Sequence, residues 1–254
     1  MTFRFDILTL FPELVESFLG CSLVGRARTL GLLQAAAWNI RDFADPPHYK
    51  VDDSPYGGGA GMVMTAEPVK RALDAVRLTS PRSFVVYLSP AGEPFNQRKA
   101  EELAHRDGGL CFLCGRYEGV DERVLEAEVD SRISLGDFIL MGGEVAAMAV
   151  MEAVLRLRPG VLGNEDSMNT ESFALTSDGG VYLEAPQYTR PLLWRGKSVP
   201  EVLLSGDHRR IAEWRRTASR ELTGRVRPDL FDSQLRGEKA NPKNGDSAGN
   251  VQDP

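Results

Sequence analysis

Short apolar runs alternate with amphipathic stretches from Phe3 to Leu157. We predict strands at residues 3–11, 34–40, 83–89 and 110–114. The last two runs are almost entirely apolar, which is typical of strands buried on both faces of a sheet. Apolar residues at helical spacing predict helices from Pro12 toward Leu30 and at 65–78, 96–105, 121–129 and 144–157. This alternation predicts an α/β fold around a mostly parallel sheet.

The pattern changes after Pro159 and Gly160. Residues 161–180 are rich in Gly, Asn, Ser, Thr and Asp and lack periodicity, which predicts a flexible interdomain linker. Further helices are expected at 199–204 and 207–222, and the second has an apolar stripe made by Ile211, Trp214, Ala218 and Leu222. We therefore predict a catalytic domain over 1–160, the linker over 161–180, a small all-α domain over 181–236 and a disordered tail over 237–254.

The charge of the chain is unevenly distributed. Residues 190–227 hold ten Lys or Arg against four Asp or Glu, a local net charge of +6, whereas the whole chain carries −6. A basic segment on an acidic body suggests a polyanionic partner that meets one part of the molecule. A solvated, Arg-rich helix face would explain the same composition, and charge alone does not decide between the two.

Composition restricts the class of protein. The chain has 254 residues, 42% of them hydrophobic and 26% charged, which is typical of a globular protein with its own core. The longest apolar stretch, residues 138–155, contains Glu144, Glu152 and a glycine pair, so a membrane span is not expected. Arg4 and Asp6 interrupt the first apolar run, which argues against a secretory signal. Three cysteines, an odd number, favour a reducing compartment, and we expect a cytoplasmic protein.

Several familiar motifs fail on inspection. Cys111 and Cys114 have redox spacing, but residues three apart on a strand point to opposite faces, so we expect two core thiols. The three histidines are scattered and show no zinc-site spacing. The segment Gly196-Lys197-Ser198 resembles the end of a phosphate loop, but Pro191 stands where the first glycine belongs.

Glycine-rich loops are the remaining candidate for a ligand site. One is Pro55–Met62, and three more lie at 89–92, 115–119 and 135–144, after predicted strands or in the segment that follows them. Ligands of open α/β sheets bind beyond the carboxyl ends of the strands, where these three loops could converge. A single glycine loop is an ordinary turn, so the prediction depends on their joint occurrence.

A possible acid–base pair flanks the predicted linker. Arg156 ends the helix that leads into it, and Glu171 and Asp166 lie within it. A carboxylate with a nearby arginine could supply a general base and an electrostatic clamp. The alternative is a solvated acid and a surface arginine.

The chain closely resembles the TrmD family of bacterial tRNA (guanine-N1)-methyltransferases, within the SPOUT superfamily. The resemblance covers Phe3 to Phe231 and rests on many uncommon strings in one order. These are FDILTLFP at 5–12, PYGGGAGM at 55–62, LSP at 88–90, CGRYEGVDER at 114–123, LGDF at 135–138, GGE at 142–144, RPGVLG at 158–163, YTRP at 188–191 and VLLSG at 202–206.

The resemblance implies a parallel sheet with a trefoil knot, followed by a helical C-terminal domain, in an obligate homodimer whose active sites use both subunits. It implies methyl transfer from S-adenosylmethionine to N1 of the guanosine just 3′ of the tRNA anticodon, position 37. Glu171 would be the base, supplied across the dimer interface, and Arg156 would stabilise charge on guanine O6. S-adenosylmethionine would contact Tyr87, Leu88, Ser89, Pro90, Gly115, Tyr117, Glu118, Leu135, Gly136, Phe138, Leu140, Gly142 and Gly143. The substrate would contact Gly58, Gly59, Met62, Arg116, Arg209, Arg210 and Arg215, with the basic helix holding tRNA phosphates.

Two positions depart from the family pattern. The family usually has Asp where Glu171 stands, and the extra methylene moves the carboxylate by about 1.5 Å, so Asp166 is a competing base. Met141 stands where the family commonly has a small residue beside the pocket glycines. The alternatives are a methyltransferase for another RNA position and a non-catalytic RNA-binding relative. No metal ligands are assigned, although the resemblance implies a magnesium dependence that Glu118 would serve.

Overall fold

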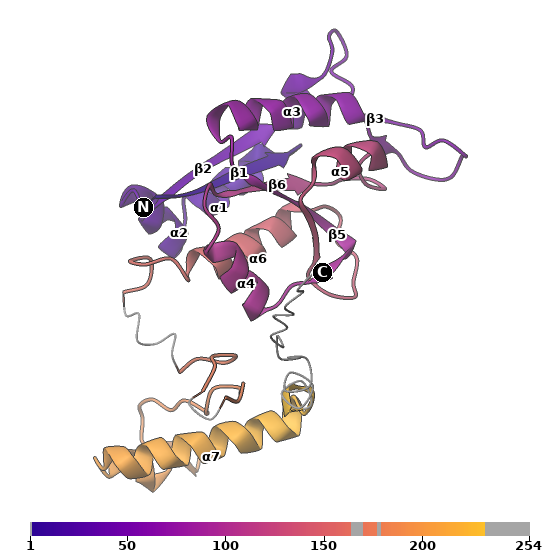
Figure 1. Cartoon of the computed structure of the whole chain (residues 1–254). Helices are drawn as coiled ribbons and strands as arrows, with labels where there is room; N and C mark the ends of the chain where they lie inside the picture. The colour runs from indigo at the N-terminus through magenta and orange to yellow at the C-terminus, as the bar shows by residue number, and fades with distance from the viewer. Residues whose placement is uncertain (1, 164–169, 177–178, 232–254) are drawn as a thin grey trace, which may run out of the picture. The chain divides into compact units, whose positions relative to one another are not determined.

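The computed structural model describes residues 2–163, 170–176 and 179–231. The chain divides into two compact units, Met1–Gly163 and Asn164–Pro254, and each is described by itself (Figure 1). The first unit is built around a five-stranded, fully parallel sheet of order β2-β1-β6-β5-β7. Its strands are β1 (Phe3–Thr9), β2 (Leu33–Asn39), β5 (Phe84–Pro94), β6 (Leu110–Cys114) and β7 (Ser131–Ser134). The predicted α/β fold with a parallel sheet is confirmed.

Helices cover both faces of this sheet (Figure 1). One face packs against α1 (Pro12–Leu19), α2 (Ser22–Thr29), α4 (Gln97–Ala104) and α6 (Glu144–Leu155). The other packs against α3 (Ala66–Thr79) and α5 (Glu122–Glu128). All five residues of β6 are buried, as its apolar run predicts, and Cys111 and Cys114 lie in opposite apolar layers. Burial raises the pKa of both thiols, which fits core residues rather than a redox pair.

The predicted helix from Pro12 toward Leu30 is wrong. The structure has two helices there, because α1 ends at Leu19 with Gly20 as its C-cap, and Cys21 is extended, with φ −105° and ψ 153°. Glycine is a poor helix former, and the apolar pattern continues across the break without revealing it. The sequence also did not predict β7, and β5 continues five residues past Ser89 with a shift in register between Leu88 and Glu93.

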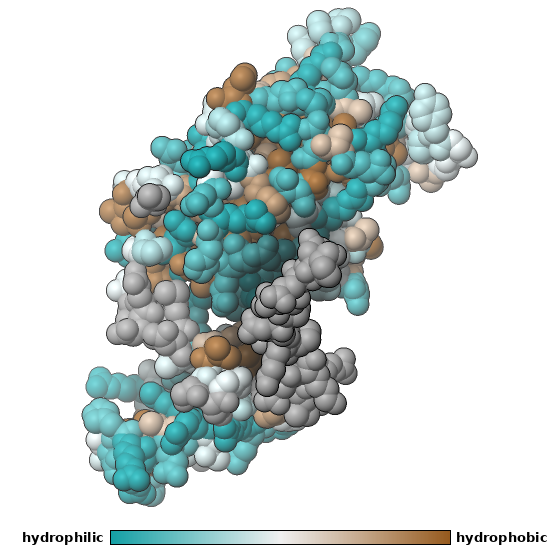
Figure 2. All heavy atoms as spheres, in the orientation of Figure 1, coloured by the Kyte–Doolittle hydropathy of each residue, from teal (hydrophilic) through white to brown (hydrophobic). Residues whose placement is uncertain are grey.

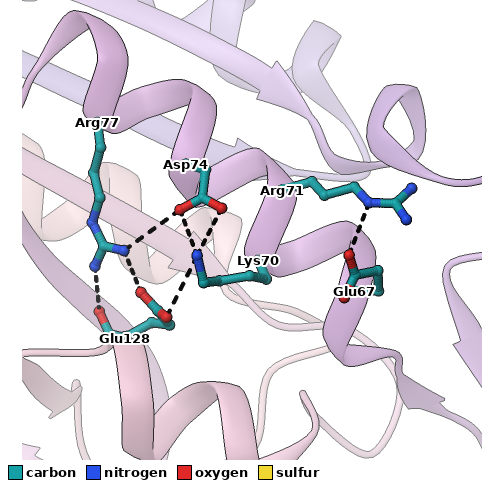
Figure 3. Close-up of polar contacts among 6 residues, drawn as sticks. All are labelled: Glu67, Lys70, Arg71, Asp74, Arg77 and Glu128. Atoms are coloured by element: carbon teal, nitrogen blue, oxygen red, sulfur yellow. Dashed lines mark hydrogen bonds and ion pairs between the residues drawn. The ribbon is translucent and has the colours of Figure 1, made fainter.

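Charged side chains tie α3 to α5 beside the sheet (Figure 3). The Lys70 ammonium lies 2.6 Å from Asp74 and 3.7 Å from Glu128, and the Arg77 guanidinium also binds Glu128. A short hairpin of β3 (Asp52–Asp53) and β4 (Val63–Met64) and a 3-10 helix, η1 (Ile40–Phe43), complete the unit. No helix in the parts that the structure describes is long and apolar enough to cross a membrane.

The second unit is built on α7 (His208–Val226). It also contains the hairpin of β8 (Leu193–Trp194) and β9 (Lys197–Ser198), and a single 3-10 turn, η3 (Glu201–Leu204), where a helix was predicted. The predicted apolar stripe of α7 is half-buried, and hydrophilic residues dominate the face that Figure 2 shows. The Thr223 hydroxyl accepts the Leu183 N–H at 2.9 Å, which fixes the preceding segment on the helix.

Part of the predicted linker forms local hydrogen bonds. Phe173 donates its N–H to the Tyr182 carbonyl, and Thr176 donates to Gly180, each at 2.9 Å. Residues 164–169, which include Asp166, and residues 177–178 lie outside the described residues. The predicted tail lies outside them too.

Candidate active site

Residues 87–90 within β5 and the segments that follow β6 and β7 enclose a pocket of about 260 Å³. The lining contains all of the residues for which the resemblance implies contact with the methyl donor: Tyr87, Leu88, Ser89, Pro90, Gly115, Tyr117, Glu118, Leu135, Gly136, Phe138, Leu140, Gly142 and Gly143. It also contains Arg116, which was assigned to the substrate. The sequence did not assign the other lining residues, Gly119, Ile133, Ser134, Ile139, Met141 and Ala146. The predicted loops at 115–119 and 135–144 therefore meet at the pocket, whereas the predicted loop at 89–92 is part of β5 and lines the pocket from within that strand.

Tyr87 lines the pocket. The residue is buried, and desolvation raises the pKa of its phenol, against the opposing effect of a hydrogen bond with the Val120 backbone. The phenol is therefore protonated at neutral pH and can serve as a hydrogen-bond donor. A Cβ on Gly115 would lie 2.8 Å from the Tyr87 hydroxyl, so this loop can pass the ring only with glycine there.

The loop 138–141 carries exposed apolar side chains beside the pocket. Phe138 is 54% exposed, Ile139 81% and Met141 92%. Most of Met141 is therefore in contact with solvent, and the residue contributes only a small part of its surface to the pocket lining. Exposed apolar surface of this kind commonly marks a contact with another molecule.

The glycine loop at 55–62 is joined to the pocket through its last residue. The Met62 carbonyl accepts the Glu118 N–H at 2.9 Å, and Met64 continues the contact by donating to Gly119 at 2.8 Å. Gly58 and Gly59 are exposed, with φ of 77° and 126°. The predicted substrate residue Met62 thus lies next to the pocket, whereas these two glycines stand farther out in the loop.

Sequence reasoning missed the role of Glu144. Its carboxylate is 1% exposed, accepts the Thr9 hydroxyl at 2.7 Å and accepts Arg116 Nε at 3.1 Å. The one available signal was an acidic residue at the start of an otherwise apolar helix, because a buried carboxylate needs partners.

The predicted catalytic residues belong to different units. Arg156 is half-buried at the C-terminus of α6 in the first unit. Glu171 is half-buried in the second unit, where its carbonyl accepts the Ala174 N–H at 3.2 Å. Their roles stay predictions, and Asp166, the competing base, lies outside the described residues.

The predicted RNA-contacting arginines lie on α7. Arg209, Arg210 and Arg215 are all exposed, and the first two donate their backbone N–H groups to the N-cap carboxylate of Asp207. These cationic side chains of α7 are therefore open to solvent. Within the described residues, no three His, Cys, Asp or Glu side chains group as a metal site would require, so Glu118 has no such companions and we derive no metal step.

Comparisons with known proteins agree with this arrangement. A sequence model of the family described as tRNA (Guanine-1)-methyltransferase TrmD matches residues 3–233. The tRNA (guanine-N(1)-)-methyltransferase of Citrifermentans bemidjiense is 53% identical over 229 residues, which cover 90% of each chain. The protein of that name from Myxococcus xanthus is 53% identical over 89% of each chain. The one from Deinococcus radiodurans is 53% identical over 89% of this chain and 79% of its own. This chain therefore belongs to the tRNA (guanine-1)-methyltransferase TrmD family.

Proposed function

We propose that this protein methylates N1 of the guanosine immediately 3′ of the tRNA anticodon, position 37. The family match along residues 3–233 and relatives at 53% identity support its assignment as a tRNA (guanine-N1)-methyltransferase. The observation that carries the proposal is the pocket between β5 and the segments that follow β6 and β7, because it gathers every residue assigned to the methyl donor.

The pocket suits S-adenosylmethionine in its chemistry. When bound, this group supplies a methyl carried on a sulfonium sulfur. Glycines at 115, 136, 142 and 143 line it, and their lack of side chains lets the polar parts of a nucleoside come close to the backbone. Leu88, Leu135 and Leu140 provide apolar surface for its adenine ring.

Guanine N1 must lose a proton before it becomes an effective nucleophile. Glu171 accepts that proton as the general base. Arg156 then stabilises the negative charge that develops on O6. Holding N1 in line with the methyl group supplies the rest of the rate enhancement through orientation. The target base must leave its stack before its edge can be reached.

Assembly completes the site in this proposal. The loops around the pocket belong to a trefoil knot, an exception to the rule that chains do not thread loops. The protein acts as a homodimer in which Glu171 of one subunit serves the pocket of the other. The exposed apolar side chains of Phe138, Ile139 and Met141 support a subunit contact beside the pocket.

The second unit holds the tRNA in this proposal. The local charge of +6 over residues 190–227 and the exposed arginines of α7 suit the phosphates of an anticodon stem-loop. Cytoplasmic tRNA is the substrate we expect.

A methyl-transfer assay tests the function. Wild-type protein is given labelled S-adenosylmethionine and an unmodified tRNA transcript with G37, beside a matched transcript with A37. We expect transfer to the first transcript only, with loss of at least 100-fold in Glu171→Gln and little change in Asp166→Asn. The reverse result for the two variants would assign the base to Asp166.

Two other outcomes would favour the competing functions. Transfer to the A37 transcript, or to another nucleotide of the G37 transcript, would indicate a methyltransferase for a different RNA position. Binding of both tRNA and S-adenosylmethionine without any transfer would indicate a non-catalytic RNA-binding relative.

A further inference from the structure

The guanidinium of Arg116 is held by the protein on several sides. Its Nε donates to one oxygen of Glu144 at 3.1 Å, and a terminal nitrogen lies 2.9 Å from the other oxygen. The second terminal nitrogen reaches the Met141 carbonyl at 3.4 Å. The Phe11 ring lies 4.3 Å from its central carbon, within the range of a cation–π contact.

Glu144 gives this contact its rigidity. The carboxylate is buried at the first residue of α6, and its remaining partner is the hydroxyl of Thr9 at the end of β1. A two-point contact between a carboxylate and a guanidinium fixes orientation as well as distance. The N-terminus of α6 further favours the negative charge. Arg116 is therefore anchored to the sheet and to a helix.

Arg116 also contacts the loop 138–143, which lines another part of the pocket. A Cβ on Gly142 would overlap its side chain, so the guanidinium packs directly on the backbone of that loop. One side chain thus joins two pocket walls, the loop 115–119 that follows β6 and the loop 138–143 that precedes α6. The Arg116 side chain is 21% exposed, and little of it is left for an RNA phosphate.

We infer that Glu144 is a positioning residue that acts through Arg116. Their ion pair holds the two loops at the separation that S-adenosylmethionine requires, so Arg116 serves the methyl donor rather than the tRNA. This inference rests on the proposed function, because it assigns the pocket to that ligand.

A double-mutant cycle tests the inference. Full-length wild type, Glu144→Gln, Arg116→Lys and the double variant are titrated calorimetrically with S-adenosylhomocysteine and assayed for KM and kcat. Each single variant should raise the Kd for S-adenosylhomocysteine and the KM for S-adenosylmethionine about tenfold, since lysine cannot make the two-point contact. The kcat and the KM for tRNA should change less than threefold. The double variant should be no more than about twofold worse than either single variant, because both remove one interaction.

Asp6→Asn is the matched control. Asp6 is another fully buried carboxylate, bound by Arg4 at 2.8 Å and by the Trp38 indole at 2.9 Å, and it does not line the pocket. We expect Asp6→Asn to lower the Tm without changing the Kd. If Glu144→Gln does not fold, Glu144→Asp keeps the charge on a shorter arm and should raise the Kd about threefold.

Three results would overturn the inference. The first is a higher KM for tRNA in Arg116→Lys with an unchanged Kd, which would make Arg116 an RNA contact. The second is a rise in Kd in the double variant equal to the product of the rises in the two single variants. The third is a rise in Kd in Asp6→Asn as large as that in Glu144→Gln. A wild-type protein that does not bind S-adenosylhomocysteine would instead contradict the proposed function itself.

Discussion

The two units of the chain bury their apolar residues to different degrees. In the first, β6 is buried along its whole length and is covered by helices on both faces. In the second, the only buried residue of α7 is Thr223, and the apolar stripe that includes Trp214 and Leu222 is half-buried. The pocket belongs to the first unit and the densest positive charge to the second.

This difference fits two kinds of recognition. A methyl-transfer pocket must hold its groups to within about 0.5 Å, which requires loops anchored on a packed sheet. Attraction of RNA phosphates depends on charge over several ångströms and tolerates a less densely packed helix. Under the proposed function, the first unit supplies geometric precision and the second supplies electrostatic attraction for the tRNA.

Removing a core ring from the first unit should have the largest effect on stability. Phe112 is fully buried, with its ring centroid 5.7 Å from that of Phe5. We expect Phe112→Ala to lower the free energy of unfolding by about 3–5 kcal/mol through lost burial and a cavity. Leu222→Ala, at a half-buried site of α7, should cost about 1 kcal/mol. Urea unfolding measures both, and equal losses would contradict the contrast between the two units.

Removing positive charge from α7 should weaken tRNA binding without affecting the pocket. For the triple variant Arg209→Gln, Arg210→Gln and Arg215→Gln we expect the KM for tRNA to rise by roughly 10–100-fold and the salt dependence of binding to fall by about two to three units of slope. The Kd for S-adenosylhomocysteine should be unchanged.

The control removes the same charge from the first unit. Arg26, Arg82 and Arg98 are exposed there, and their replacement by Gln alters the net charge equally. A similar rise in the KM for tRNA in this control would show that overall charge, rather than α7, attracts the RNA.

Strong local patterns made much of the first unit predictable. The stripe of Val69, Ala72, Leu73 and Val76 predicted α3 to within about one residue at each end, and these side chains are buried. In contrast, β7 has four residues and is a strand because β5 lies beside it, so its own sequence gives little signal. The break at Gly20 was hidden because the apolar pattern resumes in α2.

The candidate site was predictable in its members but not in its contacts. Glycine loops after strands, together with the family resemblance, predicted the pocket lining. The pairing of Arg116 with Glu144 joins residues 28 apart on different elements, and no local pattern encodes it. The chemical roles of Arg156 and Glu171 stay predictions that the assay must decide.

The smallest expected effects compare the caps of one helix from each unit. Asp121 caps α5, accepts the Arg123 N–H at 3.0 Å and pairs with the Arg123 guanidinium at 2.7 Å. Asp207 caps α7 by accepting the N–H groups of Arg209 and Arg210. Replacing either aspartate by Ala should cost about 1 kcal/mol of unfolding free energy.

The pH dependence distinguishes the ion pair of Asp121 from its cap. Hydrogen bonds from Arg123 lower the pKa of Asp121. The ionised carboxylate therefore stabilises the folded state at pH values above the ordinary aspartate pKa, and this stabilisation is lost as the pH falls through the lowered pKa. Asp121→Asn retains the cap acceptor but should lose this acid-dependent part of the stability, which urea unfolding between pH 7 and pH 3 would measure.

Asp207→Ala should instead weaken tRNA binding slightly at pH 7 and leave the Kd for S-adenosylhomocysteine unchanged. A change in that Kd would mean that the order of α7 affects the pocket, and the two units could then no longer be treated as separate recognition devices.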